Sequence, residues 1–85
     1  MSTQKLRVKS LSGQAKEAIL QYIEEMDLKT DNKLPREEAL AEMLGVSRIT
    51  IRQALNDLAA EGIIFRRQGR GTFVNVDSLN IKVTF

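Results

Sequence analysis

The 85-residue sequence contains no cysteine and no histidine. Without cysteine, the chain has neither disulfides nor thiolate metal ligands. Without histidine, it lacks the side chain that most often serves as a general base and as a metal ligand. We therefore expect no catalytic residues, no metal site and no cofactor, and we do not expect an enzyme.

Long apolar stretches, internal repeats and low-complexity segments are missing as well. The apolar runs extend over only a few residues, so the sequence predicts neither a signal peptide nor a membrane-spanning helix. A cytoplasmic protein is the expectation that follows. The length allows one domain with a modest core.

The formal net charge of +2 is too small to indicate nucleic-acid binding, but the charges are unevenly distributed. Residues 1–16 have four basic side chains and no acid, whereas residues 17–42 have eight acids against three basic side chains. Residues 43–76 have five arginines against two acids. Such a separation allows a weakly charged protein to present one basic face.

Two segments in the first half of the chain show the periodicity of amphipathic helices. In residues 11–26, apolar side chains recur at steps of three and four, and Ser12 is a candidate cap. This stripe consists of Leu11, Ala15, Ala18, Ile19, Tyr22, Ile23 and Met26. A polar loop ending at Leu34-Pro35 leads into a shorter helix over residues 36–44. Its apolar face should contain Ala39, Leu40, Met43 and Leu44.

A tight turn should connect this helix to a third one. Gly45 lies where helices commonly end in the left-handed conformation, which glycine adopts without steric cost. Ser47 can then cap a helix over residues 48–61, and Val46 and Ile51 have the spacing of a hydrophobic staple. The buried stripe of this helix should be Ile51, Ala54, Leu55 and Leu58. Two helices joined in this way are typical of a helix-turn-helix.

The residues after the third helix predict a β-hairpin. Gly62 should end the helix, and two β-prone runs then flank a Gln-Gly-Arg-Gly tip. Residues 77–85 alternate weakly, and we interpret them either as a last strand or as the beginning of a linker. Three helices plus a two-stranded wing form a winged helix-turn-helix, which is mainly α with a small β-hairpin.

One face of the third helix is a candidate contact surface, formed by Arg48, Ile49, Arg52, Gln53 and Asn56. Most polar helix faces are simply solvated. The alternative is a recognition helix, because the second helix of a helix-turn-helix enters the major groove, where the arginine fork can donate to guanine. Thr50 and Ser47 could then donate to phosphates, and for Ser47 this is compatible with capping.

The hairpin is a second candidate contact surface, with basic side chains around its glycines: Arg66, Arg67, Gly69, Arg70 and Gly71. Turn geometry alone accounts for the glycines. Alternatively, a slim basic tip can enter the minor groove, with Gln68 as a further contact. Because side chains alternate along a strand, Arg66 and Arg67 should lie on opposite faces and have different roles.

The chain resembles the DNA-binding domain of the GntR family of bacterial transcription factors over residues 34–74, LPREEALAEMLGVSRITIRQALNDLAAEGIIFRRQGRGTFV. The motifs LGVSRxTxRQALxxLxxEG and RRQGRGTFV are far more specific than a generic helix-turn-helix. The resemblance implies a repressor that binds inverted repeats of double-stranded DNA as a homodimer, in the bacterial cytoplasm at the nucleoid. It also implies a C-terminal effector domain that binds a small-molecule metabolite.

By position, the resemblance implies DNA contacts for Arg48, Thr50 and Arg52, and it places Gly69 in a wing tip that reaches the minor groove. We therefore predict that the helix 48–61 lies in the major groove and that the tip 68–71 lies in the minor groove. The predicted contact residues are Arg36, Ser47, Arg48, Ile49, Thr50, Arg52, Gln53, Arg67, Gln68, Gly69, Arg70, Gly71 and Thr72.

Two residues depart from the family pattern Leu-Pro-Ser-Glu-Arg. Arg36 replaces the serine, which caps and donates to phosphate, and Glu38 replaces an arginine that often contacts a base. Glu38 can accept from the amino group of cytosine but cannot donate to guanine. The alternative is that this contact is missing and that Arg36 approaches the DNA backbone instead. Glu37 and Glu38 are otherwise explained by the dipole of the helix that they begin.

The expected organisation is an N-terminal arm (1–10), the winged helix-turn-helix domain (11–76) and the start of a linker (77–85). The effector domain would lie outside this chain. A winged helix can also serve as a protein–protein interaction module, although such a module would more often expose apolar residues in place of these arginines. Binding of double-stranded RNA ranks lower, because its deep, narrow groove excludes a recognition helix.

Overall fold

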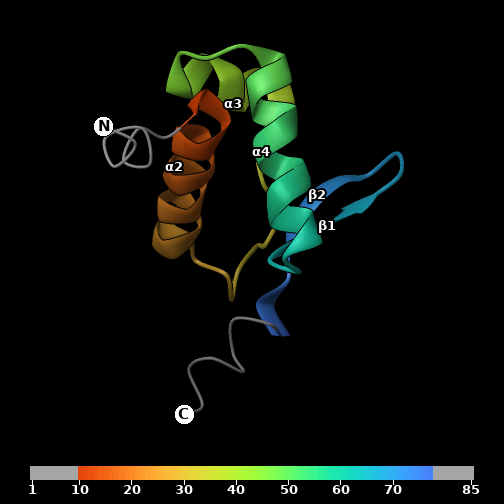
Figure 1. Cartoon of the computed structure of the whole chain (residues 1–85). Helices are drawn as coiled ribbons and strands as arrows, with labels where there is room; N and C mark the ends of the chain where they lie inside the picture. Colours follow the sequence, from red (N-terminus) through yellow and green to blue (C-terminus); the bar gives the residue numbers. More distant parts are fainter. Residues whose placement is uncertain (1–9, 78–85) are drawn as a thin grey trace.

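The computed structural model describes residues 10–77. Its elements are α2 (Leu11–Glu25), α3 (Glu37–Leu44), α4 (Arg48–Ala60), β1 (Ile64–Arg67) and β2 (Gly71–Val74). Figure 1 shows α2 and α4 side by side, α3 across one end of the pair, and the hairpin projecting beyond α4. The predicted fold, mainly α with a two-stranded wing, is confirmed. Most of the predicted N-terminal arm (1–9) and residues 78–85 of the predicted linker lie outside the described residues.

The first helix begins at Leu11, two residues before the position that a cap at Ser12 would give. The cap is Ser10, whose Oγ accepts from the backbone amide of Gly13 at 3.0 Å. The assignment of Ser12 as the cap is therefore wrong, because Ser12 already lies in the first turn, where its hydroxyl bonds to that of Ser10. The residue just before the first helical residue is the one whose side chain accepts from the amide of the third, and in α2 that residue is Ser10.

The turn between α3 and α4 has the predicted geometry. Gly45 ends α3 with a φ of 70°, and the amide of Val46 donates to the carbonyl of Ala41 at 3.1 Å. Ser47 caps α4 by accepting from the amide of Thr50 at 3.1 Å. The helix ends at Ala60, one residue before the predicted end. The local sequence thus determines the turn that presents the beginning of α4.

The core lies where α4 packs against α2, α3 and the inner side of the hairpin. The four residues predicted for the buried stripe of α4 are all buried. They meet Ala15, Ile19 and Ile23 of α2, Leu40 and Ala41 of α3, and Leu34, Ile63, Ile64 and Val74 around the hairpin. Outside the core, Lys16 and Glu61 form an ion pair between α2 and the end of α4.

Three residues predicted for apolar faces are exposed: Leu11, Ala39 and Met43. Leu11 is the first residue of α2, and the buried side chains of this helix begin one turn later at Ala15. The short helix α3 buries Leu40 and Ala41, so its buried face is rotated by about one residue from the predicted one. Only the packing against α4 selects between these two faces, because α3 is too short for its periodicity to define one.

A segment predicted as loop pairs with the hairpin. The amide of Leu34 donates to the carbonyl of Thr72 at 2.8 Å, and the amide of Val74 donates to the carbonyl of Asn32 at 2.7 Å. Lys33 and Phe73 form the antiparallel bridge between these two bonds. β2 therefore lies between β1 and residues 32–34. This pairing connects the approach to α3 directly to the wing.

Candidate nucleic-acid interface

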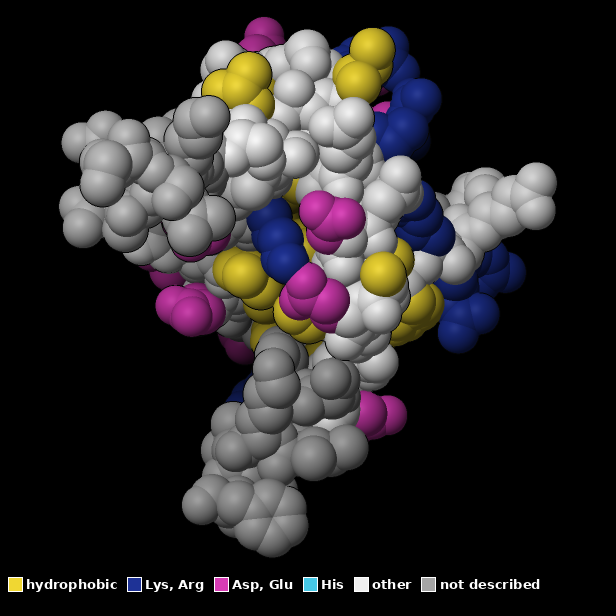
Figure 2. Space-filling model, in the orientation of Figure 1, with side chains coloured by type: hydrophobic (Ala, Val, Ile, Leu, Met, Phe, Trp, Pro, Cys, Tyr) yellow, Lys and Arg dark blue, Asp and Glu magenta, His cyan; other side chains and the backbone are white. Residues whose placement is uncertain are grey.

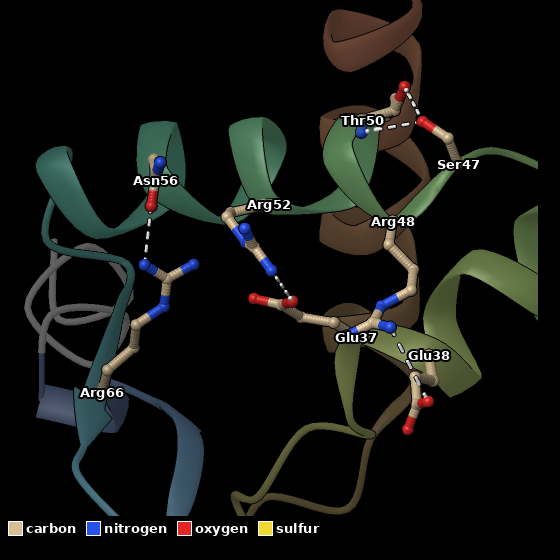
Figure 3. Close-up of polar contacts among 8 residues, drawn as sticks. All are labelled: Glu37, Glu38, Ser47, Arg48, Thr50, Arg52, Asn56 and Arg66. Atoms are coloured by element: carbon tan, nitrogen blue, oxygen red, sulfur yellow. Dashed lines mark hydrogen bonds and ion pairs between the residues drawn. The ribbon is translucent and has the colours of Figure 1, made fainter.

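Two arginines at the beginning of α4 meet two acids at the beginning of α3. Arg52 Nη2 donates to Glu37 Oε1 at 3.2 Å, and Arg48 Nη1 lies 3.9 Å from Glu38 Oε2. Figure 3 shows Arg48 and Arg52 extending from α4 toward the two glutamates at the beginning of α3. The helix dipole explains why acids lie at the beginning of α3, but it does not predict that these acids pair with the candidate contact residues of α4. The pair of Arg48 and Glu38 is exposed enough for Arg48 to exchange partners at little cost.

Asn56 continues the same stripe, since it follows Arg48 and Arg52 at four-residue intervals. Its Oδ1 accepts from Arg66 Nη1 of β1 at 2.6 Å (Figure 3). Arg66 therefore faces α4. Arg66 was placed on the candidate hairpin surface but is not among the predicted contact residues, because strand alternation separated it from Arg67.

Ser47 and Thr50 form a cap in which both hydroxyls take part. Besides accepting from the amide of Thr50, Ser47 Oγ lies 2.9 Å from Thr50 Oγ1. Ser47 is exposed, whereas Thr50 is 91% buried, its exposed fraction being 9%. The cap thus orients the exposed side chains that follow it, Arg48 and Ile49, of which Ile49 is 67% exposed.

The wing has an aromatic pair beneath its basic side chains. Phe65 and Phe73 are opposite one another in the strand register and stack with ring centroids 5.7 Å apart. The guanidinium carbon of Arg67 lies 5.3 Å from the centroid of the Phe65 ring, within cation–π range. Arg66 and Arg67 thus lie on opposite sides of β1, as alternation predicted. The tip, Gln68-Gly69-Arg70, is exposed.

A groove of about 420 Å³ lies between the wing and the segment that leads into α3. The cationic residues that line it are Lys33, Arg36, Arg66, Arg67 and Arg70, and Glu37 is the one acidic residue among its lining. Lys33 extends over Gly71, where an added Cβ would lie 2.9 Å from Lys33 Cε. A groove with these charges has a positive potential and suits a polyanion.

The basic residues from α4 and the wing share one side of the molecule. In Figure 2, the dark blue side chains gather along the right-hand side, over α4 and toward the wing. The structure exposes most of the predicted contact residues on α4: Arg48, Ile49, Arg52 and Gln53. Arg36 is exposed as the N-cap residue of α3, with no side-chain cap bond, so its guanidinium is available to a ligand. Sequence reasoning missed Lys33 as a neighbour of these residues. It named Asn56 and Arg66 on the candidate surfaces but did not predict that they bond to one another.

Within residues 10–77, no group of acidic side chains is arranged to hold a metal ion. Over the same residues, no helix has the length and apolar character needed to cross a membrane.

Three helices with a capped turn before α4, followed by a basic two-stranded wing, define a winged helix-turn-helix domain. Residues 11–74 match the gntR family of bacterial regulatory proteins, and the chain belongs to this family.

The chain is similar in sequence to transcriptional regulators. The chain is 45% identical over 62 residues to the HTH-type transcriptional repressor NagR of Bacillus subtilis (strain 168), covering 73% of this chain and 26% of that protein. It is 44% identical over 62 residues to the arabinose metabolism transcriptional repressor of Geobacillus stearothermophilus. That match covers 73% of this chain and 17% of the repressor. The chain thus spans about a quarter of the length of these relatives, or less.

Among solved structures, the chain is similar to AraR(DBD) in complex with operator ORR3. The TM-score is 0.69 at 40% sequence identity, and the match covers 79% of this chain and 81% of that chain. The structure of possible transcriptional regulator YydK from Bacillus subtilis has a TM-score of 0.68 at 35% sequence identity. That match covers 78% of this chain and 29% of the YydK chain.

Proposed function

We propose that this chain is the sequence-specific, double-stranded DNA-binding domain of a bacterial transcriptional repressor, and that it has no enzymatic activity. The observation that carries the proposal is the exposed stripe of Arg48 and Arg52 at the capped beginning of α4, on the same side as the basic wing. The names of the relatives support it, since they are repressors, and so does the AraR(DBD) structure, which is a complex with an operator.

In this proposal α4 lies in the major groove, with Arg48 and Arg52 donating to guanine edges. Gln53 offers a further hydrogen-bonding group, and Ile49 packs against a thymine methyl. Ser47 donates to a phosphate while it caps the helix. Thr50 contributes less than its predicted contact suggests, because its hydroxyl is buried against Ser47.

The wing carries the second half of the proposed interface. Gln68, Gly69 and Arg70 form the tip that enters the minor groove, where negative potential favours arginine. On either side of the tip, the strand residues Arg67, Gly71 and Thr72 lie along the sugar-phosphate backbone of the DNA next to the minor groove. Arg36 contacts a phosphate from across the groove beside the wing.

The proposal also covers the organisation of the whole protein. Residues 11–76 form the domain, an arm (1–10) precedes it, and residues 77–85 begin a linker to an effector domain that binds a small metabolite. Through that domain the protein is a homodimer that binds an inverted repeat, and it acts at the nucleoid in the bacterial cytoplasm. A single domain should bind a half-site weakly, because two linked domains gain from effective concentration.

The experiment is a salt titration of binding to two duplexes, an inverted repeat selected from a random library and its scrambled sequence. Tighter binding to the repeat, weakening steeply with salt, is the expected result, and the slope counts phosphate contacts. Arg48→Ala should reduce affinity for the repeat by about 1–3 kcal/mol and affinity for the scrambled duplex by much less. Equal losses on both duplexes would remove base recognition by Arg48. No preference of the unsubstituted chain for any selected sequence would overturn the proposal.

A further inference from the structure

We propose that Glu38 determines base specificity by accepting a hydrogen bond from a cytosine amino group, beside the guanine that Arg48 contacts. This inference rests on the proposed DNA-binding function. It concerns a residue at which the chain departs from the family pattern, so the specificity of relatives does not supply it.

The two glutamates of α3 differ in how much of their hydrogen-bonding capacity is used. The side chain of Glu37 is 27% exposed and accepts from Arg52 at 3.2 Å, so Glu37 positions that arginine. The side chain of Glu38 is 71% exposed, and its contact with Arg48 is 3.9 Å long, beyond hydrogen-bonding distance. Glu38 thus keeps its acceptor capacity for a ligand while Arg48 partly balances its charge.

Few positions on a DNA duplex can accommodate a carboxylate. Phosphates repel it, and guanine and thymine present acceptors to the major groove. Adenine presents an amino group with the N7 acceptor beside it, whereas cytosine presents an amino donor alone. The edge of cytosine is therefore the one that best matches Glu38.

The contact between Glu38 and Arg48 strengthens this match. An acceptor from α3 and a donor fork from α4 lie next to one another on the exposed side of the molecule (Figure 3). A C·G pair presents the complementary set, a cytosine donor next to the two guanine acceptors. Binding to such a pair exchanges a long ion pair in water for two short hydrogen bonds, which is favourable because the ion pair itself contributes little.

The test compares base preferences of four chains by selection from randomised duplexes at low salt, followed by affinity measurements on single-base variants of the selected site. The chains are the unsubstituted protein, Glu38→Gln, Glu38→Arg and the control Glu42→Gln. Glu42 is an exposed acid of the same helix, so the control removes the same charge as Glu38→Gln. Glu38→Gln and Glu42→Gln should increase affinity for random DNA alike, because each removes one negative charge.

Only the two substitutions of Glu38 should change the base preference. We expect the unsubstituted chain and Glu42→Gln to prefer cytosine at one position by about fivefold to tenfold. Glu38→Gln should lose this preference or shift it to adenine, the base that glutamine matches, and Glu38→Arg should shift it to guanine. Because Glu38 is exposed, these variants should fold.

The possible failures are distinguishable. A selected motif that is the same in all four chains, within twofold at every position, would overturn the role of Glu38 and leave the proposed function intact. A motif without cytosine at any position would have the same consequence. If the unsubstituted chain selects no motif, the proposed function fails and this inference fails with it.

Discussion

Arg66 of the wing donates to Asn56 of α4 at 2.6 Å, and this hydrogen bond joins the two elements that carry the proposed DNA contacts. Both side chains are exposed, so the bond stabilises the orientation of the wing more than it stabilises the core. It leaves Arg66 engaged on the side of β1 opposite Arg67. The wing thus divides its arginines between an internal contact and the external surface.

Asn56→Ala should remove this contact and lower the free energy of unfolding by about 0.5–1 kcal/mol, the usual contribution of a solvent-accessible hydrogen bond. Asn56→Asp keeps an acceptor for Arg66 and should retain the stability. Urea unfolding of the three chains is the measurement. Equal stability of Asn56→Ala and the unsubstituted chain would show that the bond does not contribute.

Ser47→Ala should destabilise the fold by about 1 kcal/mol, because the amide of Thr50 loses its acceptor at the beginning of α4. Ser47→Asp restores an acceptor and should recover the stability while adding a negative charge to the proposed interface. We therefore expect Ser47→Asp to be stable in thermal unfolding and weak in DNA binding. Recovery of both properties by aspartate would contradict a contact between Ser47 and phosphate.

Arg67→Ala should weaken binding to the selected and the scrambled duplex by the same factor and reduce the salt slope by about 1, since a phosphate contact carries no sequence information. Arg67→Lys should preserve the slope because it keeps the charge. This variant lacks the planar guanidinium that lies over Phe65, so the affinity of the variant for DNA should still fall modestly. A loss confined to the selected duplex would assign Arg67 to base recognition instead.

Gly71→Ala should lower the free energy of unfolding by about 1–3 kcal/mol, because a φ of 126° is strained for any residue with a Cβ. The new Cβ would also meet Lys33 Cε at 2.9 Å, but that flexible side chain can move. The double variant Gly71→Ala with Lys33→Ala should therefore remain almost as destabilised as Gly71→Ala alone. Full recovery in the double variant would show that the clash with Lys33, and not backbone strain, is the cause.

Much of the fold follows from short-range sequence signals. The stripe of α4 and the glycine–serine turn before it depend on residues a few positions apart, so the sequence predicts them correctly. The same holds for the opposite orientations of Arg66 and Arg67, which require only the period of a strand. The errors occur where a local signal was weak, as at Ser12 and along the two turns of α3.

The contacts that shape the interface have a different origin. Glu37 and Arg52 lie 15 positions apart, and Asn32 and Val74 lie 42 positions apart. No local periodicity connects such residues, because their distance depends on how α3 packs across α4 and how residues 32–34 pair with β2. The sequence by itself thus determined the helices, the turn and the basic composition of the wing. Tertiary packing alone decided which acid faces which arginine, because helix orientation is the collective result of burying apolar surface across the whole domain.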